Sequence, residues 1–232
     1  MSRPLLERAI TSAALQSIGA ACVWAANLPR GRRRAWSRYR PWDLLKSRAI
    51  AARLVDGDAV LDVGCGTGHM LAQIALFRSI RPHGVDLAVV PGAFPEIPIS
   101  TYDGRSLPFP DRAFDATMFC YVMHHLLPDQ AAALFQEAVR VTRRRVFLIE
   151  DSMAAFGPLY RLRNRLHRIE AGLRYRDYDA GYEIPPDEAM FKTHAEWQAW
   201  LGAQPGVAQV EVESFAEVSQ YDHHTLLDVT LG

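Results

Sequence analysis

The chain has 232 residues, enough for one domain with a full hydrophobic core. Its 26 basic and 26 acidic side chains cancel, so the composition does not indicate a nucleic-acid-binding protein. The three cysteines are an odd number and have no metal-ligand spacing, which favours a reducing, cytoplasmic setting over a disulfide framework.

The positive charge is concentrated near the N-terminus. Residues 1–50 contain ten Lys or Arg and two acidic residues, a net charge of +8, so residues 51–232 carry −8. Residues 9–28 lack charge and are long enough to span a bilayer, but they are rich in alanine and contain several polar side chains. We therefore interpret residues 1–47 as an N-terminal helical extension. Packing on the domain and peripheral membrane contact through the basic residues both stay open, and we disfavour a nucleic-acid-binding arm.

Hydrophobic patterning predicts strands that alternate with helices along the rest of the chain. Helices are predicted at residues 43–54, 69–77, 129–141 and 194–201. Strands are predicted at residues 59–63, 84–87, 99–102, 116–121, 145–149, 207–212 and 225–231. Strands separated by helices form parallel sheets through right-handed crossovers. We expect an α/β, Rossmann-like fold: a mostly parallel seven-stranded sheet with helices on both faces.

The turn after the first predicted strand carries three glycines with G-x-G-x-G spacing, Gly64, Gly66 and Gly68. Glycine permits positive φ angles and lets a ligand approach the backbone closely. A dinucleotide-binding turn has the spacing G-x-G-x-x-G, and its third glycine would stand where this chain has His69. Asp62 would repel a pyrophosphate, whereas it would attract an α-amino group or a sulfonium.

Three further motifs follow in order. Asp86 ends the second predicted strand, where a carboxylate binds both hydroxyls of a ribose. Residues 102–109 contain Asp103 followed by Leu-Pro-Phe. Residues 114–125 begin with Phe-Asp, continue as an apolar strand and end in two histidines.

These four motifs, in this order, resemble those of the class I S-adenosylmethionine-dependent methyltransferases, in particular the small-molecule, type 11-like domains. The resemblance implies a domain at residues 48–232 that uses S-adenosyl-L-methionine as its cofactor. In this family the acid at the position of Asp103 meets the adenine amino group. The cofactor-binding residues that the resemblance implies are Asp62, Gly64, Cys65, Gly66, Gly68, Asp86, Leu87, Asp103, Gly104 and Phe119.

Residues 152–190 lie outside the shared motifs. Their leucines and isoleucine recur at steps of three and four, which predicts an amphipathic helix, and several tyrosines follow. The resemblance implies that this insertion is a helical lid over the acceptor pocket. A helix that simply packs on the sheet is the alternative.

The cofactor's sulfonium is already an activated electrophile, so the enzyme mainly has to position the acceptor. A general base is needed only for a hydroxyl, an amine or an acidic carbon. The resemblance places two catalytic residues beside the acceptor, His124 and Asp151. Either of the adjacent histidines, His124 or His125, fits equally well a role in holding the loop or capping the next helix.

We predict no metal site. Neither pair of adjacent histidines has the spacing of zinc ligands, and no third ligand accompanies Glu150 and Asp151.

The predicted function is methyl transfer to a small-molecule acceptor, including lipophilic ones such as quinones, lipids or natural products. Residues 121–124 lack the Asn/Asp-Pro-Pro-Tyr motif of enzymes that methylate adenine or amide nitrogen. A non-catalytic cofactor-binding partner subunit stays open. A nicotinamide oxidoreductase is disfavoured by the missing glycine and by the absence of a Tyr-x-x-x-Lys pair. The sequence does not set the oligomeric state.

Overall fold

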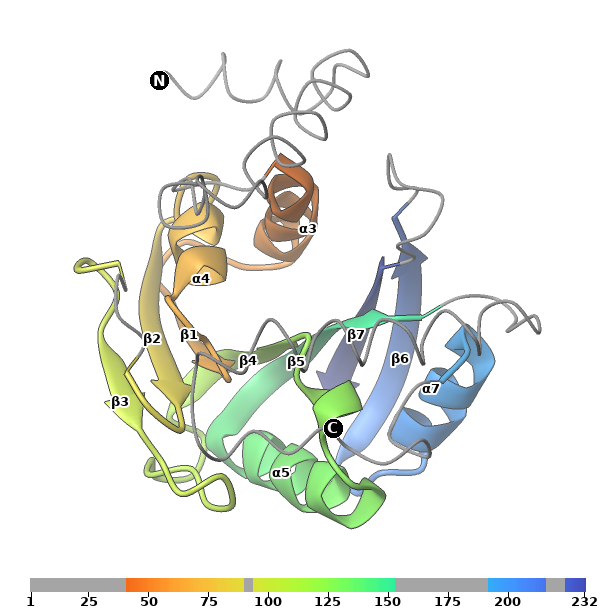
Figure 1. The fold of residues 1–232 in the computed structure, drawn as a ribbon. Coiled ribbons are helices and arrows are strands. Elements are labelled where there is room, and N and C mark those ends of the chain that lie inside the picture. Colours follow the sequence, from red (N-terminus) through yellow and green to blue (C-terminus); the bar gives the residue numbers. More distant parts are fainter. Residues whose placement is uncertain (1–40, 90–93, 153–191, 216–223) are drawn as a thin grey trace, which may run out of the picture.

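A computed structural model describes residues 41–89, 94–152, 192–215 and 224–232 of the chain. The strands are β1 (Asp58–Val63), β2 (Ile80–Asp86), β3 (Ile99–Thr101), β4 (Phe114–Cys120), β5 (Thr142–Asp151), β6 (Val207–Ser214) and β7 (His224–Leu231) (Figure 1). The helices are α3 (Pro41–Ala52), α4 (His69–Ile74), α5 (Pro128–Val141) and α7 (His194–Gly202), and η1 (Met123–His125) is a short 3-10 helix.

The strands form one seven-stranded sheet with the order β3-β2-β1-β4-β5-β7-β6. The first five strands pair in parallel, and β7 is antiparallel to both of its neighbours, β5 and β6. The strand order reverses between β1 and β4. In open α/β sheets, ligands bind outside the carboxyl ends of the strands at such a reversal. The predicted fold class is confirmed, and its topology favours ligand binding outside the carboxyl ends of β1 and β4.

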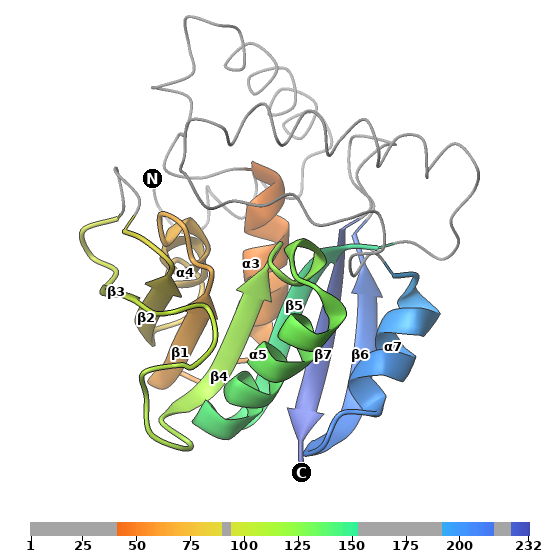
Figure 2. The ribbon, with the colours of Figure 1, turned by 60° about the horizontal axis from the view of Figure 1, so that its bottom comes forward.

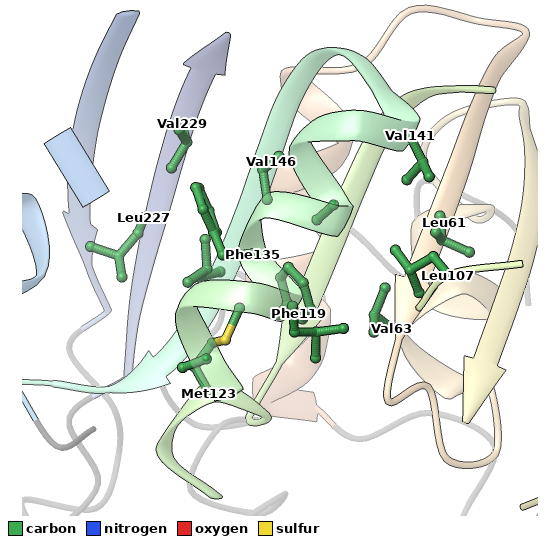
Figure 3. Close-up of a cluster of buried hydrophobic side chains, with 14 of the residues drawn as sticks. Leu61, Val63, Leu107, Phe119, Met123, Phe135, Val141, Val146, Leu227 and Val229 are labelled. Atoms are coloured by element: carbon green, nitrogen blue, oxygen red, sulfur yellow. The ribbon is translucent and has the colours of Figure 1, made fainter. Parts of the chain in front are cut away.

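Helices cover both faces of the sheet (Figures 1 and 2). On one face, α5 and α7 pack on a core that includes Phe135, Val141 and Phe119 (Figure 3). On the other face, α3 and α4 pack on a second core that includes Leu44 and Met70. We refer to these as the α5 face and the α3 face.

The strand β1 is buried along its whole length because helices cover both sides of it. Its side chains alternate between the faces: Leu61 and Val63 join the α5 core, whereas Val60 joins the α3 core. Asp62 therefore projects to the α3 face, since it lies two residues from Val60.

The helix α3 spans the domain boundary that the sequence suggested between residues 47 and 48. Its Leu44 and Ile50, on either side of that boundary, are both buried in the α3 core. Leu44, on the N-terminal side of the predicted boundary, thus packs in the same core as Ile50. The rest of the N-terminal extension and the expected lid at residues 152–190, apart from residue 152, lie outside the described residues. Within the described parts, no helix is both long enough and apolar enough to span a bilayer.

Candidate active site

The glycine turn between β1 and α4 has the backbone conformation that its spacing predicted. Gly64, Gly66 and Gly68 have φ angles of 74°, 54° and 78°. A Cβ atom on Gly64 would lie 2.6 Å from Cγ2 of Val122, so the segments that follow β1 and β4 touch at this point. A Cβ atom on Gly66 would meet nothing within 4 Å. The turn is therefore closed on the side of β4 and open at Gly66, where a ligand can approach.

Asp62 is a buried carboxyl group without a complete set of partners. It is 1% exposed, and its Oδ1 has no hydrogen-bond partner among the described residues. Burial raises the pKa of Asp62 well above its ordinary value, and the charge of Asp86 adds to this effect. A buried acceptor of this kind is costly unless a donor reaches it. The α-ammonium group of S-adenosylmethionine is such a donor, so the site fits the expected cofactor.

Asp86 is tied to the glycine turn. Its Oδ2 accepts a hydrogen bond from the backbone N–H of Gly66 at 2.7 Å, and its Oδ1 accepts one from that of Leu87 at 2.7 Å. Each carboxylate oxygen has further lone pairs, so these bonds leave acceptor capacity for hydroxyl groups. This geometry places the carboxylate beside the open side of the turn, as ribose binding requires.

The segment after β3 forms a second, more exposed part of the site. Asp103 is exposed, and its Oδ1 accepts hydrogen bonds from the backbone N–H groups of Arg105 and Ser106, both at 2.8 Å. These bonds lower the pKa of Asp103. A Cβ atom on Gly104 would lie 3.1 Å from Cδ2 of Leu87, whose side chain is 65% exposed. The ionised carboxylate of Asp103 and the exposed apolar side chain of Leu87 thus lie in the same part of the site. They suit the amino group and the ring of an adenine.

Two residues of α5, which sequence reasoning missed, hold this segment in place. Glu137 accepts a hydrogen bond from the N–H of Leu107 at 2.9 Å. Arg140 donates to the carbonyl groups of Leu107 and Phe109, at 3.0 and 2.8 Å, and also pairs with Glu137. The Leu-Pro-Phe stretch is therefore a structural anchor for the loop that carries Asp103. The only signal in the sequence was the helical i, i+3 spacing of an acid and an arginine.

Two predicted cofactor-binding residues turn their side chains into the protein. Phe119 is fully buried in the core of the α5 face (Figure 3), so only its backbone is left to meet a ligand. Cys65 is 4% exposed, and a Cβ atom on Gly84 would lie 2.5 Å from its Sγ. Burial raises the pKa of the Cys65 thiol, as expected of a packed side chain rather than a nucleophile.

His124 lies in η1 and pairs with an acid, but that acid is Glu150. Nδ1 of His124 is 2.5 Å from Oε2 of Glu150, and Oε1 accepts a hydrogen bond from the N–H of Met123 at 2.8 Å. Both side chains are buried. The sequence favoured Asp151 as the catalytic acid; its backbone pairs with His224 at the end of β5, and its side chain lies outside the described part of the structure. Through these two contacts Glu150 of β5 holds η1, the start of the loop after β4.

Among the described residues, no three His, Cys, Asp or Glu side chains group in a way that could hold a metal ion.

Comparisons with known proteins agree with this geometry. Residues 60–145, which run from β1 into β5, match a family model described as a methyltransferase domain. A demethylmenaquinone methyltransferase from Corynebacterium urealyticum is 31% identical over 93 residues, a segment that covers 39% of this chain and 39% of that relative.

Solved structures share the fold at low sequence identity. Magnesium protoporphyrin IX methyltransferase from Synechocystis, with bound SAH, has a TM-score of 0.54 and 16% identity, and the match covers 84% of this chain and 86% of that one. The YcgJ protein from Bacillus subtilis has a TM-score of 0.52 and 18% identity, covering 81% and 95%. The [4+2]-cyclase SpnF has a TM-score of 0.55 and 18% identity, covering 82% and 80%.

The sheet order, the glycine turn and the family match together define the class. The match of residues 60–145 to a methyltransferase domain and the fold of the sheet both agree with the class that the motifs predicted, the class I, S-adenosylmethionine-dependent methyltransferases.

Proposed function

We propose that the chain transfers a methyl group from S-adenosylmethionine to a small-molecule acceptor. The observation that supports this most directly is the buried carboxyl of Asp62, whose Oδ1 lacks a partner among the described residues beside the open glycine turn. A dinucleotide would bring a pyrophosphate to this position, where the negative charge of Asp62 disfavours it.

Each part of the cofactor has a partner in this proposal. Asp62 would hold the α-amino group, Asp86 the ribose hydroxyls, and Asp103 the adenine amino group. The exposed Leu87 would cover one face of the adenine ring. When bound, the cofactor supplies an activated methyl group on a sulfonium, and the residues of the chain orient it and exclude water.

For the acceptor, we propose a lipophilic ring compound of the quinone or quinol type. The support is the demethylmenaquinone methyltransferase that resembles residues of this chain over 93 positions. Because fold likeness at this identity extends to a cyclase as well, the fold itself carries no argument about the acceptor.

The proposal is tested by calorimetric titration with S-adenosylmethionine, S-adenosylhomocysteine and NAD. We expect binding of the first two and none of NAD, with loss of binding in Asp62→Asn. Asp56→Asn is the matched control, because Asp56 is exposed at the opposite edge of the sheet, before β1. Preferential binding of NAD would overturn the proposal.

Turnover is measured separately with radiolabelled cofactor and a panel of reduced quinones. Methyl transfer to a ring acceptor supports the proposed reaction. Cofactor binding without transfer to any member of the panel or to a lipid extract would instead support a non-catalytic partner subunit.

A further inference from the structure

A second group of polar side chains lies at the same edge of the sheet as the glycine turn, on the α3 face. It contains Asp43 and Lys46 of α3, His69 at the start of α4, Tyr121 directly after β4, and His224 at the start of β7. We call these five residues the α3 polar cluster. None of them is among the predicted cofactor-binding residues, and elements far apart in the sequence contribute to the cluster.

A buried ion pair forms the base of the α3 polar cluster. Lys46 is fully buried and Asp43 is 1% exposed, and Nζ of Lys46 lies 3.5 Å from Oδ1 of Asp43. Nζ of Lys46 is also 2.6 Å from Nδ1 of His224, and Oδ2 of Asp43 is 3.3 Å from Nε2 of His69. A buried ion pair of this kind adds little stability compared with an apolar pair of the same size. Its presence therefore calls for a reason other than stability.

Tyr121 links this base to the carboxyl end of β4. Its hydroxyl lies 3.2 Å from Nδ1 of His224 and 3.4 Å from Oδ1 of Asp43, and Nζ of Lys46 stands 5.5 Å from the centre of its ring. Its φ angle is 62°, a left-handed conformation that is costly for an aromatic residue. Such strain is concentrated at ligand-binding sites. In this conformation the side chain of Tyr121 extends from the end of β4, where the strand order reverses, to α3.

The α3 polar cluster adjoins the proposed cofactor site on the same face of the sheet. His69 directly follows Gly68, the last glycine of the turn, and Asp62 projects to the α3 face. Burial raises the pKa of the thiol of Cys120, the neighbour of Tyr121; the charges of Asp62, Asp43 and Glu150 add to this effect, and that of Lys46 opposes it. His124, in contrast, pairs with Glu150. Glu150 directly follows Ile149, whose side chain packs on the α3 face, so the side chain of Glu150 lies toward the α5 face.

The charges of the α3 polar cluster decide which ligand it suits. Asp43 and Lys46 cancel, so the cluster offers no net attraction to a carboxylate or phosphate. Above them stand Tyr121, His69 and His224, which are half-buried and carry groups that donate or accept hydrogen bonds. Polar side chains of this kind, over a neutral buried base, match an uncharged oxygen.

We propose that the α3 polar cluster binds a neutral hydroxyl or carbonyl oxygen on the ring of the methyl acceptor, with Tyr121 and His224 as the contacting residues. The acceptor is then an oxygenated ring compound, a phenol, quinol or quinone, and neither an aromatic acid nor a plain hydrocarbon lipid. This inference rests on the proposed function, because it assumes that the acceptor sits beside the cofactor's methyl group.

The test uses three small probes that share a fluorinated benzene ring and differ in the group para to fluorine: 4-fluorophenol, fluorobenzene and 4-fluorobenzoate. Their binding to the full chain is measured by fluorine NMR in the presence of saturating S-adenosylhomocysteine. We expect 4-fluorophenol to bind about tenfold more tightly than either of the others, as two net hydrogen bonds would give. Tyr121→Phe and His224→Asn should each reduce this preference to below threefold, while the affinity for S-adenosylhomocysteine is unchanged.

His83→Asn is the matched control, since His83 lies on β2 and bonds to Ser100 away from the cluster. It should keep the full preference for the phenol. Equal binding of the three probes, a preference for benzoate, or a phenol preference that survives both variants would overturn this inference. If the wild-type chain fails to bind S-adenosylhomocysteine at all, the proposed function fails instead, so the two failures are distinguishable.

Discussion

The backbone N–H of Gly66 donates a hydrogen bond to the carboxylate of Asp86 across 2.7 Å, which joins the end of β2 to the glycine turn after β1. Motif residues twenty positions apart thus form one unit before any ligand arrives. Asp86 therefore has two roles: it shapes the turn and it presents acceptor oxygens on the open side of that turn.

This double role makes Asp86→Ala a severe change for cofactor binding. A hydrogen bond to a charged group contributes about 1.5–3 kcal/mol, so the affinity for S-adenosylmethionine should fall at least tenfold. Asp86→Asn keeps one acceptor oxygen and should lose less. Calorimetric titration measures both effects, with Asp56→Ala as the control. An unchanged affinity in a folded Asp86→Ala protein would contradict the assignment.

The second prediction concerns pH and Asp62. Burial raises the pKa of Asp62 in the folded chain, whereas the unfolded chain ionises this group near 3.8. The unfolded state therefore binds fewer protons as the pH rises between these two pKa values, and the folded chain loses stability across that window. Asp62→Asn removes this loss of stability, because asparagine does not ionise. The variant should gain free energy of unfolding at neutral pH, measured in urea without cofactor, while it loses the cofactor.

Binding of S-adenosylmethionine should lower the pKa of Asp62 again, because the ammonium group of the cofactor favours the ionised carboxylate. At pH values below the raised pKa, binding then releases a proton and the affinity rises with pH. Titrations in two buffers of different ionisation enthalpy measure that release. Binding by the wild-type protein without any proton release at these pH values would show that Asp62 does not meet the ammonium group.

A third prediction separates structure from catalysis at His124. Glu150 is fully buried and accepts from both Met123 and His124, so Glu150→Ala leaves two buried donors without their partner. Breaking a buried pair of this kind costs about 3–5 kcal/mol. Urea unfolding should show a loss of that size, against less than about 1 kcal/mol for the surface change Glu213→Ala. A small loss for Glu150→Ala would argue that this pair serves the acceptor instead.

A fourth prediction addresses the basic N-terminus, which lies outside the described residues except for its last part. We propose that its net charge of +8 over residues 1–50 attracts anionic membrane surfaces. Liposome flotation with anionic lipid should then recover the chain at low salt and lose it at high salt, because salt screens the attraction. Absence of flotation at low salt would leave the extension as a segment that packs on the domain.

The sequence predicted the elements and the residues at the strand ends better than it predicted contacts between distant residues. The carboxyl ends of β1, β2 and β4 were recognisable because glycines, acids and histidines interrupt apolar runs there. The start of β2 was missed because Pro82 interrupts the pattern. The sheet tolerates Pro82 because β3 pairs only with residues from Gly84 onward, so Pro82 has β1 as its neighbour on one side only.

The partners of His124 and Asp43 were hidden for a different reason. Alternation along a strand tells which residues share a face, but it does not tell which acid on a neighbouring strand is within reach. Glu150 and Asp151 are adjacent in sequence, so sequence position alone does not tell that Glu150 is the acid that meets His124. The α3 polar cluster likewise depends on how α3 packs beside α4 and β7.

The last prediction concerns Arg140, a positioning residue on α5. Arg140 and Glu137 form hydrogen bonds with the backbone of Leu107 and Phe109, which belong to the same loop as Asp103. Arg140→Met keeps the apolar part of the side chain but removes its hydrogen bonds to Leu107, Phe109 and Glu137. The loop that binds the adenine end of the cofactor should then be held less firmly. Calorimetric titration with S-adenosylmethionine and with adenosine distinguishes the two ends of the cofactor site. Arg140→Met should weaken the binding of both ligands by a similar factor of about three to ten, the loss expected for one net hydrogen bond or slightly more.

Asp62→Asn should weaken the binding of S-adenosylmethionine alone, because adenosine has no amino-acid part. Arg143→Met, which removes a surface ion pair with Asp115, serves as the control and should change neither affinity. If Arg140→Met weakens S-adenosylmethionine and leaves adenosine unaffected, then Arg140 does not act through the Asp103 loop.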